Sequence, residues 1–265
     1  MDERSGRIGE RLAALHQVMA QLRAPDGCPW DRAQTLDTLR GYLLEETYEL
    51  LEAIDSGDVA AHREELGDLL FQAVFQAAIR EEQGEFDLGD AADGIREKLL
   101  RRHPHVFGDG PKHDTADQVR KAWEEIKRDE KKERATLDGV PETLPALLRA
   151  VRIGEKAAQV GFDWPDPSGV RQKVDEELGE LDAAIAAGDM AHAQDELGDL
   201  LFALCNYARH LKLMPEDALR GTIRRFLARF AEVERALRAR GQKPSDVDLD
   251  QLEALWQQAK RDLAR

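Results

Sequence analysis

A pattern of five acidic residues occurs twice in this chain, and it limits the possible folds more than any other feature. Two adjacent glutamates are followed by a third, fifteen residues intervene, and a Glu and an Asp then stand three apart. The same spacing returns 131 positions later. The two sets are Glu45, Glu46, Glu49, Glu65 and Asp68, and Glu176, Glu177, Glu180, Glu196 and Asp199. A repeat offset of about half of the 265 residues predicts two related domains.

The similarity between the halves extends beyond the acids. Leu66–Phe71 is identical in sequence to Leu197–Phe202, and a Gly-Asp pair precedes both. The charged run 128–134 reads as the end of one helix, and Leu137–Pro141 then breaks the helical pattern. We therefore expect an N-terminal domain over residues 1–135 and a C-terminal domain over residues 136–265.

The sequence predicts an all-α fold, because apolar residues recur at helical spacing and alternating β-branched runs are nearly absent. Turn signals rich in Gly, Pro and Asp separate the predicted helices. The predicted helices cover residues 9–22, 36–55, 60–82, 90–101, 116–131, 142–159, 168–187, 190–212, 215–239 and 249–264. The fold class is thus two tandem, related helical domains.

Composition limits the partners. The formal net charge of −15 argues against binding to nucleic-acid polymers or anionic membranes, which require basic patches. Cys28 and Cys205 have no metal-ligand spacing, and no apolar run has the length of a signal peptide or a membrane span. We expect a cytoplasmic protein.

The acids have the placement expected of a metal site. On a helix, Glu45, Glu46 and Glu49 fall within one arc beside the apolar face, and Glu65 and Asp68 share a face of the next helix. A short turn makes these helices antiparallel neighbours, so the acid stripes can face each other. Carboxylates grouped at the edge of a core need a cation, and an all-oxygen site suits Mg²⁺, with Mn²⁺ as an alternative ion. One or two ions fit this number of ligands.

Basic and aromatic residues follow each acid cluster. Arg225 and Arg229 share one helical face, as do Lys98 and Arg102 in the first half. A Trp four residues before a Lys also occurs near the end of each half, as Trp123 with Lys127 and as Trp256 with Lys260. These cations could bind phosphates, although a solvated helical face explains any single pair equally well.

Several motifs together give the chain a resemblance to the MazG family over nearly its whole length. They are Cys28-Pro29-Trp30-Asp31, Gln34-Thr35, Tyr42–Glu46, Glu64–Phe71, Arg101–Phe107, Leu144–Leu147 and Val160–Trp164. The resemblance implies an all-α nucleoside triphosphate pyrophosphohydrolase that releases a nucleoside monophosphate and pyrophosphate. It also implies dependence on Mg²⁺ and a homodimer in which the subunits complete each helix bundle.

The resemblance assigns roles to matching positions. The metal ligands would be Glu177, Glu180, Glu196 and Asp199 in the second half, and Glu46, Glu49, Glu65 and Asp68 in the first. Substrate would be bound by Lys173, Arg225, Arg229, Trp256 and Lys260 in the second half, and by Lys98, Arg102, Trp123 and Lys127 in the first. Position 42 is Tyr where Lys173 aligns, so the first half lacks one cation.

The family's C-terminal copy is often the active one, and we therefore expect the main active site in the second half. In the expected mechanism, Glu176 or Glu177 deprotonates a water that attacks a phosphorus in line, and Arg225, Arg229 and Lys260 stabilise the leaving pyrophosphate. The acids alone do not rank the two halves.

Two other classes of function stay open at the level of sequence. The first half could bind nucleotide or build the dimer without catalysis, or the chain could be an acidic helical scaffold without a ligand. Incubation with nucleoside triphosphates and Mg²⁺ separates these readings by the products formed. The sequence names neither the base nor the sugar of the substrate.

Overall fold

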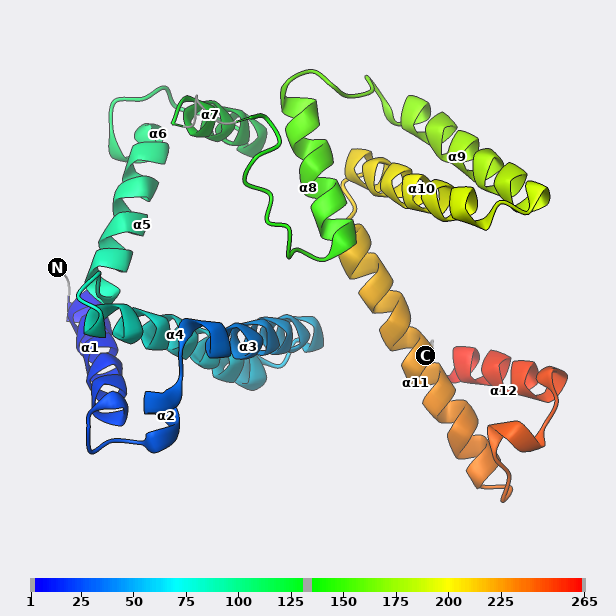
Figure 1. Cartoon of the computed structure of the whole chain (residues 1–265), viewed down its shortest axis with the longest axis horizontal. Helices are drawn as coiled ribbons and strands as arrows, with labels where there is room; N and C mark the ends of the chain where they lie inside the picture. The colour runs from blue at the N-terminus through cyan, green and yellow to red at the C-terminus, as the bar shows by residue number, and fades with distance from the viewer. Residues whose placement is uncertain (1–2, 131–134, 264–265) are drawn as a thin grey trace. The chain divides into compact units, whose positions relative to one another are not determined.

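The computed structural model describes residues 3–130 and 135–263, and over these ranges the chain is helical without strands (Figure 1). The tandem all-α prediction is confirmed. The chain divides into two compact units, Met1–Lys132 and Glu133–Arg265. The end of the charged run 128–134 lies outside the described residues, and the domain boundary expected at 135/136 stays a prediction. None of the described helices is both long and apolar enough to cross a membrane.

The N-terminal unit is built around an antiparallel pair of helices, α3 and α4, with α1 and α5 packed against α4. Its core joins Met19 of α1, Leu39 of α3 and Phe75 of α4, all nearly inaccessible to solvent. The helices are α1 (Glu3–Arg23), α2 (Pro29–Ala33), α3 (Leu36–Ser56), α4 (Val59–Glu82), α5 (Leu88–Arg102), α6 (Pro104–Phe107) and α7 (Ala116–Asp129).

The C-terminal unit repeats this antiparallel pair as α9 and α10, which lie side by side in Figure 1. Helix α8 packs on α10, and α11 packs on α8 and on α12. A Cβ at Gly154 of α8 would stand 2.4 Å from Oδ1 of Asn206, so only glycine permits the observed approach of α8 to α10. The elements are α8 (Ala146–Gln159), α9 (Pro167–Ala187), α10 (Met190–His210), α11 (Pro215–Arg238), the 3₁₀ helix η1 (Pro244–Asp246) and α12 (Leu249–Asp262).

The same turn connects the helices of both pairs. Gly57 and Gly188 end α3 and α9 in the left-handed region, at φ of 71° and 73°. Asp58 and Asp189 then accept hydrogen bonds from the first free backbone N–H groups of α4 and α10. Glycine takes this conformation without steric cost, and the Asp side chain caps the next helix. The Gly-Asp pair seen twice in the sequence therefore fixes the register of each hairpin.

Most predicted helix bounds agree with the structure within a few residues, but α1 begins at Glu3, six residues before the start predicted at residue 9. The helix predicted from residue 142 begins at Ala146, because Pro145 keeps the residue before it out of the helical region. Helix α7 ends at Asp129 and α12 at Asp262. The ends predicted for these helices, residues 131 and 264, lie outside the described residues. The short elements α2, α6 and η1 were not predicted, because three to five residues show no periodicity.

Candidate functional site

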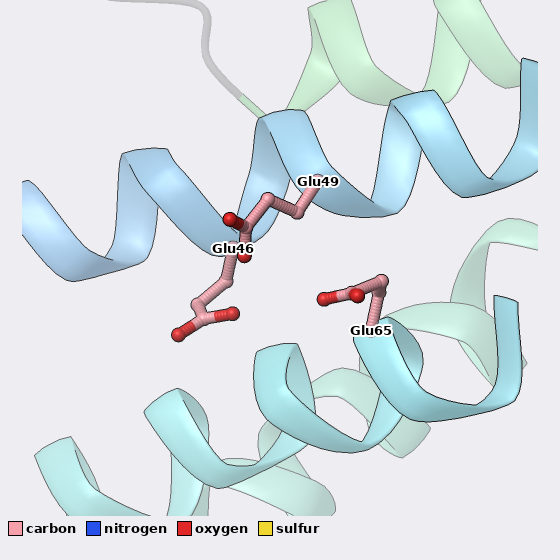
Figure 2. A group of neighbouring side chains, drawn as sticks. All are labelled: Glu46, Glu49 and Glu65. Atoms are coloured by element: carbon pink, nitrogen blue, oxygen red, sulfur yellow. The ribbon is translucent and has the colours of Figure 1, made fainter. Parts of the chain in front are cut away.

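The first acid cluster lies where α3 and α4 face each other. Glu46 and Glu49 of α3 point toward Glu65 of α4, as Figure 2 shows, and one carboxylate oxygen from each lies within 4.8 Å of the others. Asp68 is one turn after Glu65 and close enough to Glu46 to influence its ionisation. The two acid stripes predicted from helical spacing therefore meet across the hairpin.

Ionisation of the first cluster is opposed by burial and by its own charges. Burial raises the pKa of Glu46, and the carboxylates of Asp68, Glu49, Glu65 and Glu45 raise it further. Burial likewise raises the pKa of Glu65, reinforced first by Glu49 and then by Asp68. Among the side chains that the structure describes in the N-terminal unit, no Lys or Arg forms an ion pair with these carboxylates. A bound cation would relieve this repulsion.

The second acid cluster is arranged differently, because one buried carboxylate belongs to two groups. Glu177, which is 5% exposed, lies within 4.8 Å of Glu176 and Glu180 and also within 4.8 Å of Glu196 and Asp199. The first group lies along α9, and the second joins α9 to α10. Five carboxylates are thus connected through one residue.

Lys173 supplies the second cluster with a cation that the first cluster lacks. Its Nζ lies 2.6 Å from a carboxylate oxygen of Glu176 and 2.6 Å from one of Glu177. The hydrogen bonds to Glu176 and then Glu177 raise the pKa of Lys173 above its ordinary range. Tyr42 occupies the equivalent position of α3 and contacts Trp30 edge-on, with ring centroids 5.8 Å apart.

The second cluster has the chemistry of a site for hard divalent cations. All of its side-chain donors are carboxylate oxygens, the type of ligand that Mg²⁺ and Mn²⁺ prefer. Burial raises the pKa of Glu180, and the charges of Glu196 and Glu177 raise it further, against the opposing effect of Lys173. The cluster therefore keeps an excess of negative charge that one lysine does not balance.

Apart from Lys173, which lies on α9 and contacts Glu176 and Glu177, the predicted substrate-binding residues of the second half lie on α11 and α12. The guanidinium of Arg229 stands over the ring of Trp256 at 5.8 Å, and Phe226 contacts the same ring at 5.0 Å. Arg225 donates a hydrogen bond to Thr222, and the exposed Lys260 lies one turn after Trp256. Among the residues described, no ion pair joins these cations to the acids of α9 and α10. Within this unit Lys173 therefore contacts the acids, while Arg225, Arg229 and Lys260 lie on other helices and form no ion pair with them.

The first half also places an arginine over a tryptophan ring, but there a glutamate neutralises the arginine. Arg102 stands 5.3 Å from the ring of Trp123, is only 7% exposed, and donates to Glu130 at 2.5 Å. Hydrogen bonds from Arg102 and then Arg101 lower the pKa of Glu130 to about 2. Lys98 is exposed and Lys127 half-buried.

Sequence reasoning did not single out Glu130. Its hydrogen bond with Arg102 joins residues 28 positions apart, and no motif in the sequence marks such a pair. The offset that relates Trp123 to Trp256 places Leu263 at the equivalent position of the second half. A comparison of the two halves could therefore have found this difference. The predicted substrate contacts of the first half stay a prediction.

Comparisons with known proteins agree with the repeated architecture. The MazG nucleotide pyrophosphohydrolase domain matches residues 34–107 and again residues 166–233. The nucleoside triphosphate pyrophosphohydrolase of Escherichia coli K12 is 47% identical over 257 residues, which cover 95% of this chain and 97% of that protein. The Thermotoga maritima nucleoside triphosphate pyrophosphohydrolase/pyrophosphatase MazG is 44% identical over 248 residues, covering 93% of this chain and 94% of that one. A solved structure, a MazG-related protein from Thermotoga maritima, has a TM-score of 0.38 and 29% identity over 44% of this chain and 98% of that one.

Proposed function

The chain belongs to the MazG nucleotide pyrophosphohydrolase family, and we propose that it hydrolyses nucleoside triphosphates at the acid cluster of α9 and α10. The products would be a nucleoside monophosphate and pyrophosphate, and the cellular role would be control of the nucleotide pool. The observation that carries the choice of site is the position of Glu177. This buried carboxylate joins two groups of three acids, whereas the described residues of the first half form one such group.

We propose Mg²⁺ as the ion, held by Glu177, Glu180, Glu196 and Asp199. Two ions would fit the cluster, because Glu177 belongs to both groups of acids and each group offers three carboxylate oxygens. Bound there, divalent cations would neutralise the triphosphate and polarise its phosphorus. Removal of the ions with a chelator would abolish turnover, since a triphosphate cannot approach five carboxylates whose negative charge one lysine balances only in part.

Residues of α9 would accept the proton of the attacking water and hold the carboxylates in position. Lys173 holds the carboxylates of Glu176 and Glu177 at 2.6 Å, which fixes both side chains on one face of the helix. Glu176 is 57% exposed at its side chain, while that of Glu177 is 6% exposed. Glu176 is therefore the better placed of the two to accept a proton from the attacking water and pass it to solvent. Glu177, between both groups of acids, is the better ligand.

Three differences support the second half as the catalytic one. Its acid cluster has a bridging carboxylate and its own lysine, and Tyr42 replaces that lysine in the first half. The third difference is that Arg102 is bound to Glu130, while Arg229 contacts Trp256 and has no ion pair among the described residues. An arginine already paired with a carboxylate is a weaker partner for phosphate. The first half would then bind nucleotide or build the dimer without catalysis.

We also propose that the protein is a homodimer. Four apolar positions are exposed in both hairpins at the repeat offset, and we call them the apolar stripes. They are Ile54, Val59, Leu66 and Leu70 in the first half, and Ile185, Met190, Leu197 and Leu201 in the second. The exposed area of the chain is 18766 Å², while two separate compact domains of half its mass would expose about 14,000 Å² together. A second copy packed on the stripes would bury part of this excess and would bring the cations of α11 and α12 to the acids.

The test compares matched substitutions in the two halves. We expect Glu180→Ala and Asp199→Ala each to lower turnover at least about 100-fold, since losing one ligand removes several kcal/mol of transition-state stabilisation. Glu49→Ala and Asp68→Ala are the matched variants of the first half and should retain turnover within about tenfold. Products are separated by anion-exchange chromatography after incubation with Mg²⁺ and each triphosphate. Full activity of both second-half variants would refute the site, and release of diphosphate with inorganic phosphate would refute the reaction.

A further inference from the structure

The indole of Trp164 lies directly on helix α9 at Gly169. A Cβ added to Gly169 would stand 2.5 Å from Cδ1 of the indole, 3.2 Å from Cγ and 3.4 Å from Nε1. Other atoms do not come this close to a real Cβ, so only glycine permits the contact. The tryptophan is nonetheless 38% exposed. A large aromatic ring is therefore fixed on the first turn of α9 and is still accessible to a ligand.

Ion pairs hold the loop that carries this indole. The guanidinium of Arg209 donates two hydrogen bonds to Asp163, at 2.9 and 2.6 Å, and Nε2 of His210 lies 2.9 Å from the same carboxylate. The backbone N–H of Trp164 also donates to Asp163, at 3.0 Å. The side chains of Arg209 and His210 are 14% and 11% exposed, so salt screens these contacts little. The indole is thus held in place before a ligand arrives, which lowers the entropy lost on binding.

The position of the indole on α9 places it in line with the second acid cluster. Residues four apart share one face of a helix, so Gly169 is followed on this face by Lys173 and then by Glu177. Lys173 is one turn, about 6 Å, beyond Gly169, and its Nζ lies 2.6 Å from a carboxylate oxygen of Glu177. The order along the face is an aromatic ring, a cation and then carboxylates. A nucleoside triphosphate bound to magnesium presents a base, phosphates and a metal ion, which are the partners of these groups in turn.

The described residues of the first half are arranged differently. The repeat offset places Tyr42 at the position of Lys173. Trp30 corresponds to Trp164 in the repeated Gly-x-x-Trp pattern, and it contacts Tyr42 edge-on, with ring centroids 5.8 Å apart. It therefore packs on the residue that replaces the lysine. The combination of an aromatic ring with a cation one turn further along the helix belongs to the second half.

We propose that the base of the substrate stacks on the indole of Trp164. The inference rests on the proposed hydrolysis of nucleoside triphosphates in the second half and adds the residue that binds the nucleoside. Stacking on an aromatic ring accepts any base, because every base has a π face. Inorganic tripolyphosphate lacks a base, so its binding does not use the indole.

The experiment measures formation of nucleoside monophosphate from ATP, GTP, CTP and UTP with Mg²⁺ by the full chain and by Trp164→Ala. We expect the KM for all four to rise about tenfold, which is the usual effect of losing one base-stacking side chain. The kcat should change less than about twofold, because the stacked base is remote from the phosphorus that reacts. Inorganic tripolyphosphate should inhibit both proteins equally. Trp164→Phe keeps a ring and should restore most of the lost affinity.

A second variant moves the indole without removing it. Gly169→Ala inserts the Cβ that would stand 2.5 Å from Cδ1, and alanine favours a helix over glycine, so this variant should fold. It should raise the KM for the nucleotides as Trp164→Ala does. The matched control is Gly41→Ala in α3, whose added Cβ would meet no neighbouring atom within 4 Å. Trp30→Ala, at a tryptophan that is 51% exposed in the first half, is the control for Trp164→Ala. Neither control should change the KM.

Three results would overturn the inference. One is a KM that does not change in Trp164→Ala. Another is an equal loss of affinity for nucleotides and for tripolyphosphate, because the indole would then only support the structure of α9. The last is a lower sedimentation mass of Gly169→Ala, because the indole would then contact a second copy of the chain.

The failure of this inference differs from the failure of the proposed function. If the wild type releases pyrophosphate and the KM of Trp164→Ala is unchanged, the inference fails and the function stands. If the wild type forms no nucleoside monophosphate, the proposed function fails. Calorimetric binding of the same nucleotides and of tripolyphosphate with Mg²⁺ then decides the inference, since Trp164→Ala should weaken the binding of nucleotides alone.

Discussion

Replacing two leucines of the second apolar stripe should separate the proposed dimer into monomers. Leu197 and Leu201 are 41% and 45% exposed and lie one turn apart on α10. Burying the exposed part of each would contribute about 1 kcal/mol. A two-fold interface uses both leucines from both chains, so their loss removes about 4 kcal/mol, a weakening of about a thousandfold. Glutamates at these positions add the cost of burying charge, and the thousandfold figure is a lower limit.

The assay is sedimentation equilibrium of the wild type and of Leu197→Glu with Leu201→Glu over a range of micromolar concentrations. The wild type should have twice the 29.8 kDa mass of one chain, and the variant should approach that mass. Leu249→Glu is the matched control, since this residue is 77% exposed at the start of α12 and lies outside the stripes. Leu66→Glu with Leu70→Glu makes the same change in the first half.

Two results would refute the reasoning. A wild type that sediments as a single chain at every concentration would mean that the excess surface stays exposed to water. A variant that remains a dimer would mean that the interface lies elsewhere. If the dimer also completes the active site, turnover of the variant should fall as the dimer dissociates, and Leu249→Glu should keep both.

Two further predictions follow from the ion pairs. Burial raises the pKa of Asp163, but hydrogen bonds from Arg209 and His210 outweigh the effect of burial and lower that pKa to about 2. Because the pKa is lower in the folded state than in the unfolded state, the ion pairs stabilise the protein above the ordinary pKa near 4. This stabilisation is lost as the pH falls toward 2. The carboxyl is 22% exposed, so Asp163→Asn should lower the free energy of unfolding by about 2 kcal/mol at pH 7. Urea titrations of wild type and variant measure this difference, and a difference that persisted at pH 2 would contradict the prediction. Glu130→Gln, which frees Arg102, should tighten tripolyphosphate binding severalfold in a protein whose second acid cluster is disabled by Glu180→Ala and Asp199→Ala; unchanged binding in calorimetry would show that Arg102 does not reach the ligand.

The sequence by itself determined the helices, the duplication and the position of the acids. These features depend on local periodicity, and a helix with a Gly-Asp turn leaves few ways to arrange Glu46, Glu49 and Glu65. Where local rules compete, as at Pro145, the helix begins later than its apolar pattern predicts. The family resemblance came from ordered motifs and required no geometry.

Only the tertiary structure decided which charges are already paired. Glu177 joins two groups of acids because α10 lies against α9, and Arg102 is neutralised by a glutamate 28 residues away. Asp163 is likewise held by Arg209 and His210, which are 46 and 47 residues away. Burial and distance set the strength of an ion pair, and neither is a property of local sequence. The acids are therefore equal in the two halves by sequence, and their surroundings make them different.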